Sequence, residues 1–360
     1  MIDLSVGYMA IIDNMNSINT IEWTGKSLRL LDQRKLPEAE IYLEISDPEG
    51  VAVAIKDMVV RGAPAIGVAG AFGVALAASK CVGLDISTCT QYIRNIAISI
   101  GDSRPTAVNL RSSVDRMLSI LDKAGPSDHL YDLLLEEAIY IKDETFASDL
   151  RMAEFGSDII PEGANVLTHC NTGPLATSGY GTAIGVIRRA WEIGKIKQVF
   201  ATETRPWLQG ARLTTWELKR LGIPFTLVVD SAAGHLMARG EVDCVVVGAD
   251  RITANGDVAN KIGTLGLAII SNKLGIPFFV VAPRTTLDLA SKNGDAIDIE
   301  ERDPSEITDF MGKRITPYGI NVRNLSFDVT PNNYIDAIVT DLGVASKPYI
   351  GSLRGLVGNG

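Results

Sequence analysis

Cys170 is a candidate catalytic residue because of its place in the chain. It follows the apolar run VLTH and precedes NTGPLATSGYGTA, a loop that leads into a predicted helix near Thr182. A thiol beside a helix N-terminus can have its pKa lowered by the helix dipole and the free N–H groups, which would make it a base or a nucleophile. The alternative is a small buried hydrophobe at a strand end. The position favours function, and His169 should point to the other face of the sheet, so a Cys–His pair is not implied.

Asp250 is the second candidate and ends the run CVVVGAD. A carboxyl group at the mouth of a sheet can act as an acid if desolvation keeps it protonated. It could equally be a turn or N-cap carboxylate paired with Arg251, and the sequence leaves both interpretations open. Farther along, Asn260 and Lys261 precede a predicted helix, and the N–H groups there would suit an anion such as phosphate.

The segment RGAPA, which starts at Arg61, is the third candidate. Gly62 lets the backbone approach a ligand, Pro64 fits a first helical turn, and Arg61 can bind phosphate through two N–H groups. A plain capping segment is the alternative. Arg104 and Gln209 lie at predicted loop–helix junctions, where each residue by itself would be interpreted as a surface residue.

Several common cofactor motifs are missing from the sequence. It has no GxGxxG, Walker lysine loop, HExxH or paired His/Cys ligands, which argues against nicotinamide, nucleoside triphosphate or zinc. The four cysteines have no CxxC spacing, so we expect reduced cytosolic thiols and no disulfide or zinc framework. Cys244 lies inside an apolar run and should belong to the core, and Cys81 and Cys89 should be bystanders.

The hydrophobic pattern that predicts the secondary structure changes along the chain. Residues 1 to about 40 alternate between apolar and polar around a TGK turn and predict a small antiparallel hairpin or meander. Helical periodicity follows, with Pro105 expected in the first turn of one helix. Beyond Asn165, apolar runs alternate with helices and indicate a parallel, doubly wound sheet that binds ligands beyond its carboxyl edge. The predicted helices lie near 49–60, 65–80, 86–100, 106–123 and 129–156, the strands start at 165, 198, 225, 244 and 278, and a long connection with a final edge element covers 293–333.

Length and charge limit the classes of protein that remain. The chain of 360 residues predicts an N-terminal helical domain over 1–150 and an α/β domain over 151–360. Its 34 Lys and Arg against 43 Asp and Glu give a net charge of -9, so we expect no nucleic-acid or membrane partner. The apolar stretch from Ala65 is too short to span a bilayer, and MIDLSVGYMAII lacks the basic start of a secretory signal. A cytoplasmic location is therefore expected.

Long motifs in order along the chain resemble a known family. They are RGAPAIG (61–67), SRPTAVNL (103–110), THCNTGPLATSGYGTAIGVI (168–187), TETRPWLQGARLTTWEL (202–218), VVVGADRITANGDVANKIGT (245–264) and APRTTLD (282–288). In these the chain is similar to the 5-methylthioribose-1-phosphate isomerases of methionine salvage, relatives of the alpha, beta and delta subunits of eukaryotic initiation factor 2B and of ribose-1,5-bisphosphate isomerase. The resemblance extends from IEWTGKSLRLLDQRKLP at 21–37 to Asp341.

The resemblance implies roles for the candidate residues. Cys170 and Asp250 would be the catalytic pair. The implied fold is a helical N-terminal domain with a Rossmann-like C-terminal domain, in a homodimer that needs no metal or organic cofactor. The implied substrate-binding residues are Arg61, Gly62, Ala63, Arg104, Gln209, Asn260 and Lys261.

The chemistry of that reaction explains the residue types. The sugar is a furanose whose anomeric oxygen carries phosphate, so it cannot open to a free aldehyde. A protonated Asp250 could supply the ring oxygen with a proton. Cys170 could then remove the C2 proton through a cis-phosphoenolate. In a direct hydride shift it would instead help to exclude water, and the sequence leaves both routes open.

Two other functions remain in view. The first is an isomerase of ribose 1,5-bisphosphate or 5-deoxyribose 1-phosphate. A bisphosphate needs a further cationic clamp, whereas a methylthio group needs an apolar pocket, which the N-terminal segment fits better. The second is a noncatalytic, initiation factor 2B-like regulatory subunit, against which the retention of Cys170 and Asp250 in their loops argues. The apolar residues of the N-terminal segment are Trp23, Leu28, Leu30 and Leu31.

Overall fold

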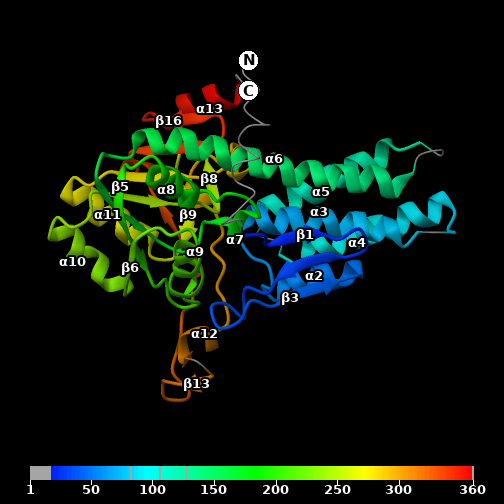
Figure 1. Cartoon of the computed structure of the whole chain (residues 1–360), viewed down its shortest axis with the longest axis horizontal. Helices are drawn as coiled ribbons and strands as arrows, with labels where there is room; N and C mark the ends of the chain where they lie inside the picture. The colour runs from blue at the N-terminus through cyan, green and yellow to red at the C-terminus, as the bar shows by residue number, and fades with distance from the viewer. Residues whose placement is uncertain (1–17, 82, 105–106, 126–128, 311, 359–360) are drawn as a thin grey trace.

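The computed structural model describes residues 18–81, 83–104, 107–125, 129–310 and 312–358. The N-terminal stretch interpreted as lacking a secretory signal and the predicted place of Pro105 lie outside these residues. A mainly helical half lies beside a half built around a sheet, and the long helix α6 runs along both (Figure 1). The protein is thus a mixed α/β structure with a helical region.

The N-terminal half confirms the predicted hairpin and helices. Its small antiparallel sheet has the order β1-β2-β3, and Ile21 pairs with Leu30 across the TGK turn. The strands are β1 (Ile21–Trp23), β2 (Leu28–Leu31) and β3 (Tyr42–Ile45), and the helices are α2 (Pro48–Lys56), α3 (Ala63–Ser79), α4 (Ile86–Asp102), α5 (Val108–Lys123) and α6 (Leu130–Ile159).

Helix α3 is the centre of this half because its small residues let neighbouring helices approach closely. A Cβ atom on Gly70 would lie 2.6 Å from the Leu110 side chain, and one on Gly73 would lie 2.7 Å from Ile100. The helix is buried from Ala65 to Ala78. Tight packing of this kind fixes the position of its N-terminal end, which borders the cavity described below.

The C-terminal half contains a seven-stranded sheet of order β16-β15-β10-β7-β4-β5-β6, parallel except for β16. Every predicted apolar run forms one of its strands. The chain goes from β4 to β5 on one side and later returns to β7 on the other, which leaves a crevice at the carboxyl ends of β4 and β7. The strands are β4 (Ala164–Thr168), β5 (Ile196–Thr202), β6 (Phe225–Val228), β7 (Cys244–Val247), β10 (Phe278–Val281), β15 (Ala337–Thr340) and β16 (Gly343–Ala345).

Helices lie around this sheet, and α8 packs against α6. Helix α6 is shared between the two halves: Leu134 and Ile141 belong to the core around α3, whereas Met152 belongs to the core of the sheet. The C-terminal helices are α7 (Pro174–Thr177), α8 (Ala183–Glu192), α9 (Thr215–Arg220), α10 (Ala233–Ala238), α11 (Thr264–Leu274) and α13 (Tyr349–Gly358).

A second, four-stranded sheet of order β11-β8-β9-β14 lies next to the carboxyl ends of the main strands. Strands β8 (Arg251–Thr253) and β9 (Val258–Lys261) form a hairpin whose turn contains Gly256 at φ +87°. Strand β14 (Phe327–Thr330) is the edge element predicted within 293–333. That region also contains α12 (Ser305–Thr308), β12 (Asp309–Phe310) and β13 (Lys313–Arg314), which project from the body (Figure 1), and β11 (Leu287–Asp288) completes the sheet.

The cysteine prediction was wrong at one pair. Cys81, just after α3, and Cys89, in the first turn of α4, form a disulfide. The spacing rules did not reveal it, because a turn between two helices brings together residues eight positions apart. Cys170 and Cys244 are free, and Cys244 is buried in β7 as predicted. No helix in the described part of the chain is both long and apolar enough to cross a membrane.

Candidate active site

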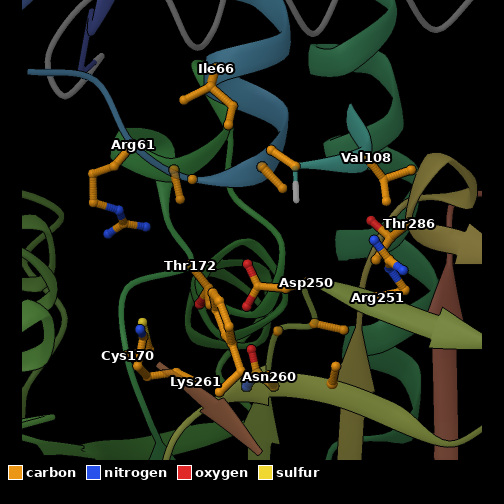
Figure 2. A pocket seen from close by; sticks show the side chains of 18 of the residues that line it. Arg61, Ile66, Val108, Cys170, Thr172, Asp250, Arg251, Asn260, Lys261 and Thr286 are labelled. Atoms are coloured by element: carbon orange, nitrogen blue, oxygen red, sulfur yellow. The ribbon is translucent and has the colours of Figure 1, made fainter. Parts of the chain in front are cut away.

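A cavity of about 360 Å³ lies between the start of α3 and the carboxyl ends of β4 and β7. Arg61, Cys170, Asp250 and Lys261 come from separate elements and face a common space (Figure 2). All the site residues predicted from the sequence line this cavity: Arg61, Gly62, Ala63, Arg104, Cys170, Gln209, Asp250, Asn260 and Lys261.

Cys170 lies just beyond β4 with φ +69°. Its N–H donates to Thr204 Oγ1 at 2.9 Å, and its carbonyl accepts from Thr214 Oγ1 at 2.6 Å. Burial raises the pKa of the thiol, and the nearby charges of Arg61 and Lys261 oppose that rise only in part. The lowered pKa expected at a helix N-terminus is therefore wrong, since desolvation outweighs the local positive charges.

His169 is buried, and both of its ring nitrogens have partners other than Cys170. One ring nitrogen, Nδ1, lies 2.6 Å from Thr202 Oγ1, and the other, Nε2, lies 2.8 Å from the Ile262 carbonyl. Both nitrogens are therefore used in fixing the loops around the cavity, and the ring is not placed to activate Cys170.

Asp250 lies between β7 and β8 on the cavity wall. Burial raises the pKa of its carboxyl group, against the opposing charges of Lys261, Arg61 and Arg104. Arg251 forms an ion pair with Asp288 at 3.7 Å. A carboxyl group held protonated in a cavity can donate a proton.

Arg61 and Gly62 lead into α3, with Pro64 in the first turn as predicted. Arg61 Nη1 donates to Asn171 Oδ1 at 2.8 Å, and Nη2 donates to the Asn171 carbonyl at 3.0 Å. Gly62 has φ +99°, and a Cβ atom there would lie 2.4 Å from the Ala176 carbonyl oxygen. The glycine is required by close packing against α7, in addition to lining the cavity.

Lys261 ends β9 and is buried. Its Nζ donates to the Ser326 carbonyl at 2.9 Å and lies 4.6 Å from the centre of the Phe327 ring. The prediction that the following N–H groups suit an anion was wrong for the start of α11. There the N–H groups of Gly263 and Leu265 donate to the Asp328 carboxylate at 2.7 and 3.1 Å, so a side chain from β14 already occupies this position.

Asn260, Gln209 and Arg104 complete the predicted set. Asn260 Nδ2 donates to Thr264 Oγ1 at 3.0 Å. Gln209 is buried with no partner for its Oε1 among the described residues, and burial lowers the pKa of Arg104. The interpretation of Gln209 and Arg104 as surface residues is corrected: Gln209 is buried, and Arg104 is half-buried on the cavity wall.

The sequence analysis missed other residues on or behind the cavity wall. Residues 296–300 and Arg302 reach it from the region interpreted as a connection, and Asn171 lies between Arg61 and the buried Glu217. The THCNTGP motif already contained Asn171, but nothing in the sequence pointed to its partner in TTWEL. Only the fold brings these segments together.

The apolar N-terminal residues do not form the pocket for which they were considered. Trp23, Leu28 and Leu30 pack in the helical core, and Leu31 packs with Leu36. Trp23, Leu28 and Leu30 share one face of the small sheet, Leu31 points to the opposite face, and none of the four lines the cavity. The apolar part of the cavity wall is supplied instead by other side chains, among them Met58, Ile66, Val108, Ile297, Ile299 and Phe327.

The donors at the cavity are mainly cationic and amide groups. Within the described ranges, no group of three or more His, Cys, Asp and Glu side chains is arranged to hold a metal ion. Cations beside a carboxyl group whose pKa is raised by burial suit an anionic, oxygen-rich ligand such as a sugar phosphate.

Comparison with known proteins identifies the family. The model of the initiation factor 2 subunit family matches residues 59–347. The methylthioribose-1-phosphate isomerase of Geobacter sulfurreducens is 52% identical over 343 residues, covering 95% of this chain and 99% of that protein. The enzyme of the same name from Desulforamulus reducens is 50% identical over 339 residues, covering 93% of this chain and 98% of that protein.

Solved structures agree with this similarity. The crystal structure of 5-methylthioribose 1-phosphate isomerase from Pyrococcus horikoshii OT3 has a TM-score of 0.90 at 42% identity, covering 96% of this chain and 97% of that one. A structure described as the delta subunit of translation initiation factor eIF-2B from A. fulgidus has a TM-score of 0.86 at 40% identity, covering 95% and 100%. The chain belongs to the initiation factor 2 subunit family. Within it, the chain belongs to the methylthioribose-1-phosphate isomerases.

Proposed function

We propose that this protein converts 5-methylthio-D-ribose 1-phosphate into 5-methylthio-D-ribulose 1-phosphate, an aldose–ketose isomerisation of methionine salvage. The observation that carries the proposal is the cavity itself, where Asp250 and Cys170 are both desolvated beside Arg61 and Lys261. Relatives of that activity match the chain over nearly its whole length.

The phosphate is proposed to bind where α3 begins. Gly62 and Ala63 present backbone at the N-terminal end of this 17-residue helix, and Arg61 is held beside it by Asn171. A helix N-terminus and a guanidinium together favour a doubly charged group. The unpartnered Gln209 Oε1 can accept from a sugar hydroxyl, and Arg104, Asn260 and Lys261 supply further donors.

The methylthio group is proposed to lie against the apolar part of the wall. Met58, Ile66 and Val108 belong to this part of the wall, and a thioether is well matched to such side chains. Two further cations on the wall, Arg302 and Arg251, form ion pairs with Glu306 and Asp288. The chain therefore provides a less suitable clamp for a second phosphate than for an apolar substituent.

Asp250 is proposed as the acid that opens the ring. Its raised pKa keeps the proton available, and transfer to the ring oxygen accompanies cleavage of the bond between C1 and that oxygen. The carboxylate left behind is stabilised by Lys261, Arg61 and Arg104, whose charges favour the ionised form.

Hydrogen transfer from C2 to C1 is proposed to follow as a hydride shift. The C2 hydroxyl proton then passes to the Asp250 carboxylate, which restores the acid, while Cys170 remains a thiol that helps to exclude water. The raised pKa of Cys170 supports this route, and a bound phosphate would neutralise the cations that oppose the rise. The enolate route would need a Cys170 thiolate to remove the C2 proton.

The finer architecture also belongs to the proposal. Separate cores around α3 and around the sheet support two domains, 1–150 and 151–360, with α6 crossing the boundary and a Rossmann-like second domain. We further propose a homodimer in the cytoplasm that needs no cofactor.

A turnover assay with purified protein tests the function. Methylthioribose 1-phosphate without added cofactor should be isomerised faster than ribose 1,5-bisphosphate or 5-deoxyribose 1-phosphate. A substrate deuterated at C2 should give product with deuterium at C1, whereas loss of the label to solvent would establish the enolate route. No turnover on any of the three, with co-purification of an initiation factor, would establish the regulatory alternative.

A further inference from the structure

Glu217 is a fully buried carboxyl group behind the cavity wall, on α9. Its Oε1 accepts from the Leu175 N–H at 2.7 Å, and its Oε2 accepts from Asn171 Nδ2. It is absent from the residues that line the cavity. A Cβ atom on Gly173 would lie 2.4 Å from Glu217 Oε2, so the loop after Cys170 is folded directly onto this carboxyl group.

Asn171 connects Glu217 to the cavity. Its Nδ2 donates to Glu217, while its Oδ1 and its carbonyl oxygen accept from the two terminal nitrogens of Arg61, at 2.8 and 3.0 Å. A carboxylate can only accept, so it requires the NH₂ end of the amide to face it. The amide oxygen must then face Arg61, and the guanidinium is fixed in one orientation.

We propose that Glu217 is a positioning residue for the isomerase: it orients the Asn171 amide and thereby holds the Arg61 guanidinium in the geometry that binds the substrate phosphate. The inference rests on the proposed function for the identity of the anion. We call the hydrogen-bonded series Glu217–Asn171–Arg61 the relay. It runs from α9 through the loop after β4 to the segment that leads into α3, so it also connects the two halves of the protein at the cavity.

The cost of this arrangement supports a role beyond packing. Burial raises the pKa of Glu217 to about 7, so an ionised carboxyl group here lowers the stability of the folded protein. A glutamine has nearly the same shape without that cost. However, a glutamine that gives its oxygen to the Leu175 N–H places its own NH₂ group opposite Asn171 Nδ2. The Asn171 amide must then turn over, so Arg61 Nη1 loses its acceptor and only the bond from Nη2 to the Asn171 carbonyl remains.

The test uses Glu217→Gln, Asn171→Asp and the double variant, measured by kcat, KM and melting temperature. In Glu217→Gln, we expect KM to rise about tenfold, with kcat within about threefold of wild type and a melting temperature at pH 8 no lower than wild type. In the double variant, an aspartate in place of Asn171 accepts from both the new glutamine and Arg61. KM should return to within about threefold of wild type. In Asn171→Asp alone, the new carboxyl group faces that of Glu217, so KM should be raised.

Asp149→Asn is the matched control. Asp149 is also a buried carboxyl group that accepts from backbone N–H groups, those of Tyr180 and Gly181 at 2.9 and 2.8 Å, and it contacts neither Asn171 nor Arg61. Its KM should stay within about twofold of wild type. The inference is overturned if folded Glu217→Gln has the KM of the control, or if the double variant binds no better than Glu217→Gln.

A binding measurement separates this inference from the proposed function. If the wild-type protein fails to turn over methylthioribose 1-phosphate, the function is wrong, and titration of inorganic phosphate by calorimetry still tests the relay. Phosphate should then bind about tenfold more weakly to Glu217→Gln and recover in the double variant. Equal dissociation constants for wild type and Glu217→Gln would overturn the relay by itself.

Discussion

Two helices begin at the edge of the cavity in similar ways, yet within the described residues a side-chain carboxylate accepts from the first N–H groups of α11 and none accepts from those of α3. Helix α3 follows Gly62 at φ +99° and α11 follows Gly263 at φ +105°, each shortly after a cation, Arg61 or Lys261. At α11 the Asp328 carboxylate accepts from the first N–H groups. At α3, no carboxylate of the described residues does so. A cation, a glycine and a helix in sequence thus indicate an anion site only where the tertiary structure leaves it unoccupied.

The contrast divides the cavity into two walls. The α3 wall, with Arg61 and the helix start, is expected to bind the phosphate. The sheet wall, with Cys170, Asp250 and Lys261, is expected to carry the reaction. Variants on the sheet wall should therefore lower kcat, and variants on the α3 wall should raise KM.

The largest effect is expected on the sheet wall. Asp250→Asn removes the proposed acid and should lower kcat by about 10³-fold with KM nearly unchanged, because an amide cannot supply the proton. Cys170→Ser provides the companion measurement and should also lower kcat strongly. Steady-state kinetics measures these effects, and circular dichroism checks that each variant is folded. A kcat within tenfold of wild type for Asp250→Asn would show that this carboxyl group is not the acid of the reaction.

Next comes the α3 wall. Arg61→Ala removes the guanidinium from the helix start and should raise KM by about 10²-fold, with a smaller change in kcat. Arg220→Ala is a control, since that arginine pairs with Glu40 on the surface. A loss confined to kcat in Arg61→Ala would contradict the division into a binding wall and a reacting wall.

A pH effect on stability should follow from the buried carboxyl group behind the α3 wall. Burial raises the pKa of Glu217 to about 7 in the folded protein, against 4.5 for a solvated glutamate side chain. Its contribution to the free energy of unfolding is fully present below 4.5 and is lost as pH rises towards 7, by about 1.4 kcal/mol per unit. Urea unfolding at about pH 5.5 and about pH 8 should therefore show Glu217→Gln gaining about 2 kcal/mol relative to wild type. A constant difference between the two pH values would contradict the raised pKa.

The smallest effect is expected at the start of α11. Asp328→Asn weakens the interaction with the Gly263 and Leu265 N–H groups and should lower the free energy of unfolding by about 1 kcal/mol. KM should not change, because this helix start is structural. A marked fall in KM would show instead that Asp328 keeps substrate phosphate away from α11, and the contrast between the two helices would need revision.

Much of the fold could be predicted because its signals are local. Strands buried on both faces appear as apolar runs such as CVVVG, and the small residues of α3 appear as a continuous Gly/Ala-rich stretch. Helix ends were predicted within a few residues wherever a proline or glycine marks them, as at Pro64. The Cys81–Cys89 disulfide had no such signal, because it depends on how two helices turn past each other.

The candidate site was predicted less evenly. Cys170 and Asp250 were found because each follows a strand of a predicted parallel sheet, and the carboxyl ends of such strands share one edge. Lys261 was predicted because it precedes the start of α11, where free N–H groups were expected, but the Asp328 carboxylate accepts from those groups. Glu217 was not found at all, because its two partners lie more than forty positions away in the chain.

The sequence by itself determined which elements form, which strands are buried and which residue types border the sheet's carboxyl edge, since these follow from hydrophobic periodicity and backbone preference along short segments. The tertiary structure alone decided how the polar groups are paired and how deeply they are buried. It brings the Asp328 carboxylate to the first N–H groups of α11 and no described carboxylate to those of α3. It raises the pKa of Cys170, where an isolated helix start would lower it. It also fixes the orientation of the Arg61 guanidinium through Asn171 and Glu217. Desolvation and hydrogen bonding depend on every neighbour in space, and those neighbours come from distant parts of the chain.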